Sequence, residues 1–347
     1  MRCGDYKETY LKDEVIFQTL WVKFWLGVMF VFLIILPYLA SDYVIYVANL
    51  IGFAIIAAVG LNLLTGSTGQ ISLGHAAFVG VGGYTTAVLI TRFGVPFWFA
   101  LPAGGFVAAF VGLIIGIPSL RVKGLYLCIA TLAAQFILDW VFVHWESVTH
   151  GIRGINVPAP TLGGIVFDTE KNYYYITLVL VIISVGFARN LLRTKWGRAF
   201  VAIRDRDLAA EMMGINLFRY KLIAFALSSF YAGVSGGLYV CFLRVVTPEY
   251  FPFSDSIKFL AMVIVGGLGS VLGSIFGAIF MTLVPEVLNV LTGASKTYFP
   301  GMSGLFVPLK EVIFGTLIVV FLVFEPHGLA EIWRRIKNFF SLWPFSY

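Results

Sequence analysis

The sequence predicts an all-α polytopic membrane protein: a bundle of about 8–10 transmembrane helices with glycine-broken or re-entrant segments and an internal repeat. Two observations predict this class. Of the 347 residues, 59% are hydrophobic and only 12% are charged, whereas a soluble domain carries about 25% charged residues. Several apolar runs also reach the ~20 residues that a helix needs to cross ~30 Å of hydrocarbon.

Hydropathy places the expected spans in order along the chain. They lie at 24–40, 43–64, 71–92, 97–119, 124–143, 173–191, 221–243 and 304–324, with one interrupted apolar stretch at 257–284. The link 65–69 separates the second span from the third, and 266–270 interrupts the late stretch; both are rich in glycine. The transmembrane domain is therefore expected over 24–325, between an amino-terminal segment 1–23 and a carboxyl-terminal tail 326–347.

The distribution of Lys and Arg orients these spans, because cytoplasmic loops accumulate basic residues. Basic residues outnumber acidic ones in 192–220, so this loop and both termini are predicted to be cytoplasmic in a bacterial inner membrane. The loop 144–172 then faces outside. These orientations are consistent with a cytoplasmic carboxyl-terminal tail only if 257–284 enters and leaves the membrane from the outer side as two short helices. A break at mid-depth is tolerated where protein or a water-filled cavity satisfies the backbone.

Composition also excludes several classes of protein. The net charge of +6 comes from basic residues at the ends of apolar spans rather than on a soluble face, so no nucleic-acid partner is expected. Cys3, Cys128 and Cys241 are widely spaced without a CxxC pair, which predicts no metal site and no disulfide framework. No cofactor is expected. The chain has no P-loop motif, so ATP-driven work would require a partner that hydrolyses the nucleotide.

The spans hold almost no ionisable side chains, although such groups usually mark proton relays and ion-coupled sites. This scarcity argues against a proton- or sodium-driven carrier. No Ser/His/Asp or metal-ligand arrangement can be assembled either, so the sequence offers no catalytic residues. A stand-alone secondary transporter or channel and a membrane enzyme stay open as less favoured alternatives.

The two Gly-rich breaks indicate a transport pathway, because paired interrupted helices in two halves mark the path in repeat-built transporters. The alternative is that small residues simply let helices pack closely. For His75 the alternative to a transport role is a packed, hydrogen-bonded side chain. The candidate pathway residues are Gly69, Gln70, Ser72, His75, Gly266, Gly267 and Gly269.

The cytoplasmic loop contains a predicted short helix over 204–216, with Asp207 as its cap and Gly214 as its stop. The helix exposes apolar side chains, Leu208 and Met212 among them, but has no core of its own. It is expected either to dock into a groove on a partner or to lie on lipid headgroups. The candidate coupling residues are Asp207, Ala209, Ala210, Glu211 and Gly214.

Several of these motifs resemble a known family. The spacing Ala209-Ala210-x-x-x-Gly214 resembles the "EAA" cytoplasmic loop of ABC importer permeases, although Leu208 stands where that loop has Glu. The segment 60–78 reads GLNLLTGSTGQISLGHAAF and resembles the signature of LivM-type permeases of high-affinity branched-chain amino acid importers. The segments 149–158, 195–199, 204–210 and 265–270 are similar to the same family.

The resemblance implies the permease subunit of an ABC importer that moves leucine, isoleucine or valine with ATP hydrolysed by partner subunits. The implied partners are a LivH-type second permease, two cytoplasmic ABC ATPase subunits, a periplasmic amino-acid-binding protein and membrane lipid. In this scheme the helix around 205–216 transmits the ATPase movement, and the dipole ends of the broken helices meet the amino acid zwitterion. A permease for urea, amides or other amino acids stays open as the alternative.

Overall fold

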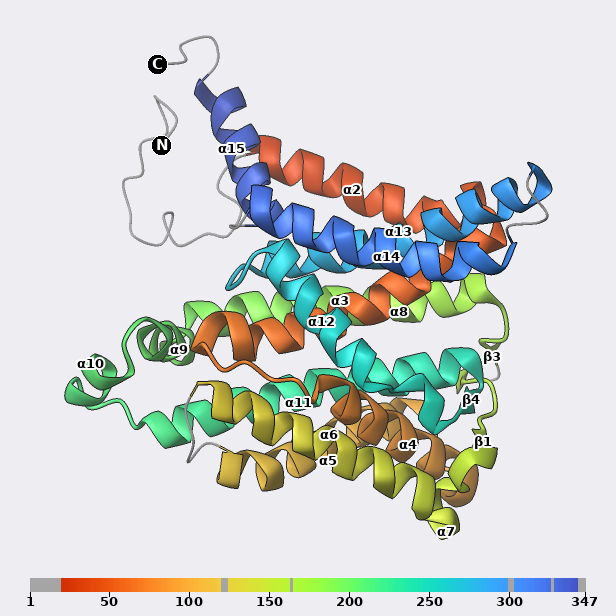
Figure 1. Ribbon diagram of the computed structural model, residues 1–347, viewed down its shortest axis with the longest axis horizontal. Helices are drawn as coiled ribbons and strands as arrows, with labels where there is room; N and C mark the ends of the chain where they lie inside the picture. The colour runs from red at the N-terminus through yellow and green to blue at the C-terminus, as the bar shows by residue number, and fades with distance from the viewer. Residues whose placement is uncertain (1–19, 120–123, 163–164, 299–302, 326–327, 343–347) are drawn as a thin grey trace.

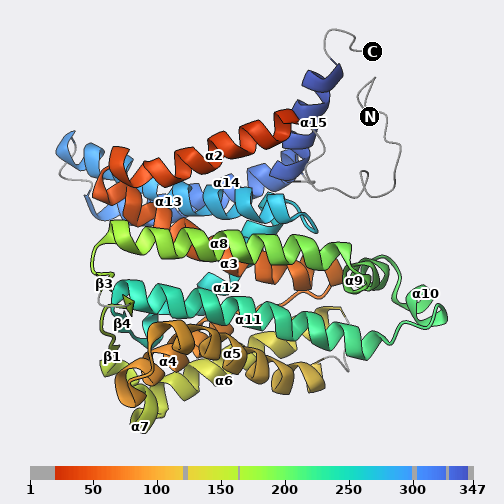
Figure 2. The ribbon, with the colours of Figure 1, turned by 180° about the vertical axis from the view of Figure 1, so that it is seen from behind.

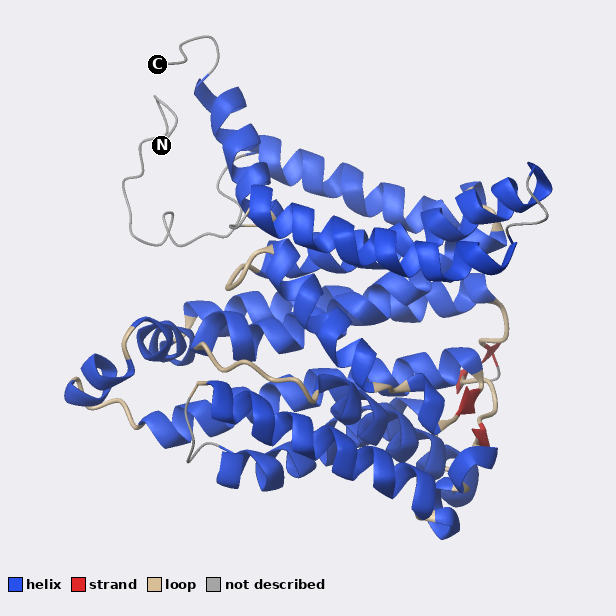
Figure 3. Ribbon diagram, viewed as in Figure 1, coloured by secondary structure: helices blue, strands red, loops and turns tan. Residues whose placement is uncertain are grey.

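The computed structural model describes residues 20–119, 124–162, 165–298, 303–325 and 328–342, and these are almost entirely helical (Figures 1 and 3). The helices are α2 (Leu20–Leu39), α3 (Asp42–Thr68), α4 (His75–Phe93), α5 (Phe97–Ser119), α6 (Leu125–His144), α7 (Glu146–Thr149), α8 (Glu170–Arg193), α9 (Lys195–Asp205), α10 (Asp207–Met212), α11 (Leu217–Leu243), α12 (Phe253–Gly266), α13 (Val271–Tyr298), α14 (Ser303–Phe324) and α15 (Leu329–Leu342). The predicted all-α class is confirmed.

Seven helices in the described residues are long and apolar enough to span a membrane. They cover Asp42–Thr68, His75–Phe93, Phe97–Ser119, Tyr126–His144, Glu170–Arg193, Leu217–Leu243 and Val271–Val290, and two shorter apolar stretches cover Lys23–Leu39 and Val312–Phe321. The chain is therefore a multi-pass membrane protein. The internal repeat and the domain limits stay predictions, and most of the segment 1–23 lies outside the described residues.

The long helices run side by side between two ends of the molecule (Figures 1 and 2). One end, the α10 end, holds α9, α10 and α15. The other, the strand end, holds α7 and two short antiparallel pairs: β1 (Ile155–Asn156) with β4 (Val245–Val246), and β2 (Thr161–Leu162) with β3 (Ile165–Val166). The start of α2 also lies at the α10 end (Figure 1).

Helix α11 packs against α4 and α5 through small residues. Gly104, Ala108, Gly112 and Gly116 recur every fourth position on α5. Gly233 of α11 lies against Ala108 and the α5 backbone, and a side chain at Gly82 of α4 would overlap the backbone of Gly233. Close backbone approach of this kind is how membrane helices gain packing energy without a hydrophobic driving force.

The expected ends of the second and third spans are wrong. The link 65–69 was expected to break the helix, but α3 continues through it to Thr68. Gly69, with φ of 72°, terminates α3: its N–H donates to Thr65 O at 3.1 Å and Gln70 N–H donates to Leu64 O at 3.3 Å. This left-handed cap satisfies carbonyls that the helix end leaves open, and the non-helical link between α3 and α4 is therefore 69–74.

The late apolar stretch also differs from the prediction of two short helices with a break at mid-depth. Helix α12 has 14 residues, but α13 has 28. Both run between the strand end and the break, as expected (Figure 1). The break contacts Asn62 and Gly66, in the last two turns of α3 toward the α10 end. It therefore lies near that end of the bundle rather than at its middle.

The α4–α11 contact generates a paired prediction. Gly82→Ala should lower the free energy of unfolding of the full chain in detergent by about 1–3 kcal/mol, because the new methyl group overlaps the backbone of Gly233. Gly186→Ala on α8, where a Cβ meets open space, should instead stabilise it by about 0.5–1 kcal/mol. Thermal unfolding monitored by size-exclusion chromatography measures both, and equal shifts would contradict the packing.

Candidate functional site

The first break is the non-helical segment 69–74, which carries the chain from the α10 end back into the bundle (Figure 1). The side chains of Gln70 and Ser72 are buried there. Gln70 Nε2 donates to Thr68 Oγ1 at 2.7 Å and to Lys221 O at 3.5 Å. Among the described residues, nothing donates to Gln70 Oε1, which is shielded from solvent. The segment thus holds one unmatched buried acceptor.

Helix α4 begins inside the bundle, so side chains must accept its first N–H groups. Ala76 N–H donates to Ser256 Oγ at 2.9 Å, and Ala77 N–H donates to Gln135 Oε1 at 2.9 Å. Ser256 Oγ also donates to Gln135 Oε1 at 3.0 Å. Gln135 Nε2 in turn donates to Phe251 O and to Asp139 Oδ1. Three helices, α4, α6 and α12, are therefore joined by one buried polar network.

His75 is the first residue of α4 and is buried. Its Nε2 lies 3.0 Å from Ala57 O of α3, and its ring meets Phe259 of α12 edge-on at 5.6 Å. These contacts tie α4 to both neighbours. His75 is thus a packed, hydrogen-bonded side chain, and a transport role for it stays a prediction.

The second break joins α12 to α13 and is held by Asn62 of α3. Gly269 N–H donates to Asn62 Oδ1 at 2.8 Å, while Asn62 Nδ2 donates to Ser270 O at 2.9 Å. Gly267 and Gly269 have φ of 117° and 80°, a region that favours glycine. The backbone of Gly328, just before α15, packs on Gly266 and Gly267 with no room for a side chain.

Both breaks reach the same arginine at the α10 end. Arg204 Nη1 donates to Gly66 O at 3.1 Å, and a side chain at Gly269 would meet the same guanidinium. Gly69 lies against the aliphatic part of Arg204. A polar pocket of about 430 Å³ opens here, lined by Thr68, Gly69, Gln70, Gly124, Leu127, Ile203, Arg204, Asp205, Arg206, Asp207, Leu208 and Lys221. Two predicted pathway residues, Gly69 and Gln70, and one predicted coupling residue, Asp207, thus line one pocket, and the other predicted site residues do not.

The predicted helix over 204–216 is two elements. Helix α9 ends at Asp205, Arg206 is extended, and α10 covers only Asp207–Met212. Asp207 Oδ1 accepts from Leu208 N–H at 2.9 Å, and Gly214, with φ of 83°, follows the helix. Ala210 is buried, whereas Ala209 and Glu211 are exposed. The apolar side chains of Leu208 (68%), Met212 (89%) and Met213 (83%) are exposed.

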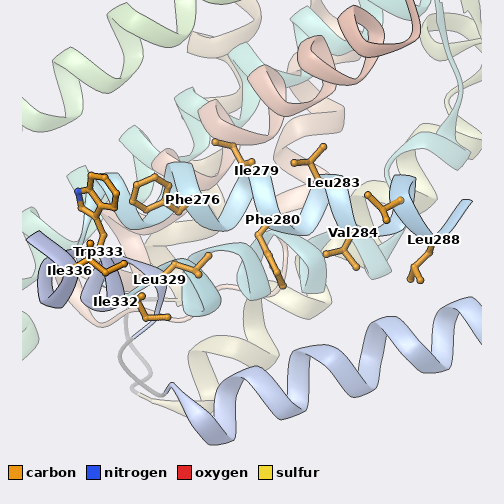
Figure 4. Close-up of a pocket in the computed structure, with 11 residues that line it drawn as sticks. Phe276, Ile279, Phe280, Leu283, Val284, Leu288, Leu329, Ile332, Trp333 and Ile336 are labelled. Atoms are coloured by element: carbon orange, nitrogen blue, oxygen red, sulfur yellow. The ribbon is translucent and has the colours of Figure 1, made fainter. Parts of the chain in front are cut away.

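A second groove, of about 510 Å³, is apolar and lies between α13 and α15 (Figure 4). Its lining residues are Phe276, Ile279, Phe280, Leu283, Val284, Val287, Leu288, Leu329, Ile332, Trp333 and Ile336. None of the predicted site residues lines it. An apolar groove on a membrane-spanning bundle suits acyl chains or another apolar helix rather than a polar solute.

Comparison with known proteins decides the family. The model of the family "Branched-chain amino acid transport system / permease component" matches residues 43–322. The chain belongs to this permease family. It is 31% identical over 343 residues to the permease protein LivM of the high-affinity branched-chain amino acid transport system of Escherichia coli K12, which covers 91% of this chain and 77% of that protein.

Other relatives agree with this assignment. The permease is 31% identical over 336 residues to LivM of Salmonella typhimurium, with 90% of this chain and 76% of that protein covered. It is 26% identical over 300 residues to a probable branched-chain amino acid transport permease protein LivH of Methanocaldococcus jannaschii, with 83% and 91% covered. No solved structure gives a significant match.

The sequence did not indicate which side chains form hydrogen bonds with the backbone at the two breaks. Asn62, Gln135 and Ser256 are neutral, so the few ionisable groups in the spans do not point to them. The spacing of Thr131, Gln135 and Asp139 at every fourth position forms a polar stripe on one helix face, which would have indicated a buried network. Thr131 Oγ1 indeed accepts from Leu73 N–H of the first break at 3.0 Å.

The network at the start of α4 generates a stability prediction. Ser256→Ala removes the acceptor of a buried N–H and should lower the free energy of unfolding by about 1–3 kcal/mol. Ser254→Ala, at an exposed position of the same helix, should change it by less than about 0.5 kcal/mol. Thermal unfolding of the purified permease compares them, and similar behaviour of the two variants would refute the network.

Proposed function

We propose that the permease is one of two pore-forming subunits of an ABC importer that carries leucine, isoleucine and valine across the bacterial inner membrane. Family membership along 43–322 is the observation that carries this proposal. The names of its relatives assign branched-chain amino acid transport to them. The second subunit would be a LivH-type permease, and a periplasmic amino-acid-binding protein would deliver the substrate.

We assign the α10 end to the cytoplasm. Arg193, Lys195, Arg198 and Arg204 at this end, together with the basic side chains of α15, follow the bias of cytoplasmic loops toward Lys and Arg. Both chain termini would then be cytoplasmic. Two ABC ATPase subunits would bind at this end, because the chain has no P-loop motif of its own.

Docking of an ATPase on α10 is supported by its exposed apolar face. Leu208, Met212 and Met213 project from a short helix that follows α9 and has only Ala210 as a buried side chain. Apolar anchors on a short helix suit a groove on a partner. Asp207, Ala209, Glu211 and Gly214 would shape and end the docking helix, while Ala210 would seat it on the permease.

The substrate path would run beside the two breaks, past Gly69, Gln70 and Ser72 and past Gly266, Gly267 and Gly269. Gln70 Oε1 is a buried acceptor that an ammonium group could use. The N–H groups at the start of α4 are already bound by Gln135 and Ser256 in this state. The start of α4 would therefore stay in place, tied to α3 and α12 through His75, and passage would depend on movement at the α12–α13 break.

Reconstitution of the permease with its second permease subunit, ATPase and binding protein in proteoliposomes tests this function. We expect ATP-dependent uptake of labelled leucine, with unlabelled isoleucine and valine in excess competing and urea and acetamide not competing. Uptake that persists without the ATPase would instead indicate a secondary transporter. Competition by urea or acetamide alone would favour the alternative substrate class.

The α10 assignment predicts loss of ATPase binding in a charged variant. Leu208→Asp combined with Met212→Asp should weaken copurification of the ATPase by about tenfold or more, because both side chains would enter an apolar groove. Ile152→Asp, which charges an equally exposed apolar position at the strand end, is the matched control. Normal ATPase recovery with the double variant would refute docking on α10.

A further inference from the structure

The break between α12 and α13 is fixed to α3 by one side chain. Asn62 is 2% exposed and uses both ends of its amide, accepting from Gly269 N–H and donating to Ser270 O. Gly269 N–H lies between the two helices and has no helical acceptor. Ser270 O also accepts from Ser274 N–H at 3.0 Å, so Asn62 holds the start of α13 as well as the break. Any displacement of this turn of α3 therefore acts directly on the break.

The same turn of α3 is held from α9 by Arg204. Its Nη1 donates to Gly66 O at 3.1 Å, and its Nε donates to Asp205 Oδ1 at 3.1 Å. A side chain at Gly66 would overlap the amide of Gly269, so the two backbones are in contact. The guanidinium, the end of α3 and the second break therefore meet at one point.

Helix α9, which carries Arg204, is packed against the bundle. Ala199, Phe200 and Ile203 are buried against the bundle. Arg204 follows them directly, two residues before Arg206, where the chain turns into α10. Arg204 therefore lies between α10 and the second break. Asp207 of α10 reaches the first break by a separate route, through its ion pair with Lys221, whose carbonyl accepts from Gln70.

We propose that Arg204 and Asn62 are positioning residues that transmit a displacement of α9 and α10 to the α12–α13 break. Arg204 acts on the α3 end through Gly66 O, and Asn62 passes the movement to Gly269 and Ser270. The proposal rests on the proposed function for the source of the force, an ATPase docked at α10. It does not depend on which solute is carried.

Arg204→Lys tests whether the two hydrogen bonds of the guanidinium, to Gly66 O and to Asp205, are needed together. Lysine keeps the charge but has a single nitrogen, which cannot donate to Gly66 O and Asp205 together in the guanidinium geometry. Arg198→Lys, at an exposed position on the same helix, is the matched control. Asn62→Asp keeps the acceptor for Gly269 N–H and places an oxygen against Ser270 O.

The decisive readout is the accessibility of the break itself. Leu268→Cys, at a half-exposed position, is introduced into a Cys3→Ser background of the assembled transporter, where Cys128 and Cys241 are buried. Maleimide labelling is followed with and without a non-hydrolysable ATP analogue. We expect the analogue to change the labelling rate about fivefold or more, the low end of a typical allosteric coupling. Arg204→Lys should abolish this difference, and Arg198→Lys should preserve it.

Three results would overturn the proposal: no nucleotide-dependent change in the parent protein, a preserved change in Arg204→Lys, or a lost change in Arg198→Lys. If Arg204 and Asn62 only stabilise the fold, their variants should lower thermal stability without removing the nucleotide response, so unfolding is measured on the same samples.

The two contacts act in series, and the variant that combines Arg204→Lys with Asn62→Asp should therefore respond like either single variant. If Asn62→Asp fails to fold, Arg204→Lys alone decides. Absent leucine uptake with an intact labelling response would refute the substrate and leave the transmission standing.

Discussion

Helix α4 of this permease begins inside the bundle, and α12 ends at a part-buried break near the α10 end, so the backbone groups left open at these two places need side-chain partners. An unpaired buried N–H costs about 1–3 kcal/mol, so each break demands its own set of acceptors and donors. Gln135 and Ser256 meet this demand at the start of α4, and Asn62 meets it between α12 and α13. The placement of α3, α6 and α12 around the breaks follows from this requirement.

The backbone groups of the two breaks are hydrogen-bonded by different kinds of neighbours, and we infer different roles for the two breaks from this. The start of α4 is enclosed by neutral side chains from α6 and α12. The α12–α13 break lies nearer the α10 end, where Arg204 and the α15 segment at Gly328 also contact it. A bundle with few ionisable groups in its spans can thus keep one break fixed and expose the other to movements at its surface.

The sequence predicted the all-α membrane class, most of the membrane-spanning helices and the family. These features depend on hydropathy and motif spacing, which are properties of the chain itself. The exact ends of the second and third helices could not be predicted. Helix α3 tolerates Gly66 in its last turn and ends only at Gly69, whose left-handed conformation caps it. The partners of the breaks, Asn62 and Gln135, depend on helices distant in the chain and needed the structure.

Hydrogen–deuterium exchange of the assembled transporter tests the central claim most directly. With and without bound nucleotide, peptides covering 74–82 should stay protected, because Gln135 and Ser256 hold the first N–H groups of α4. Peptides covering 264–272 should change their exchange rate when nucleotide binds. Fast exchange at 74–82 in both states, or unchanged exchange at 264–272, would contradict an account built on one fixed and one movable break.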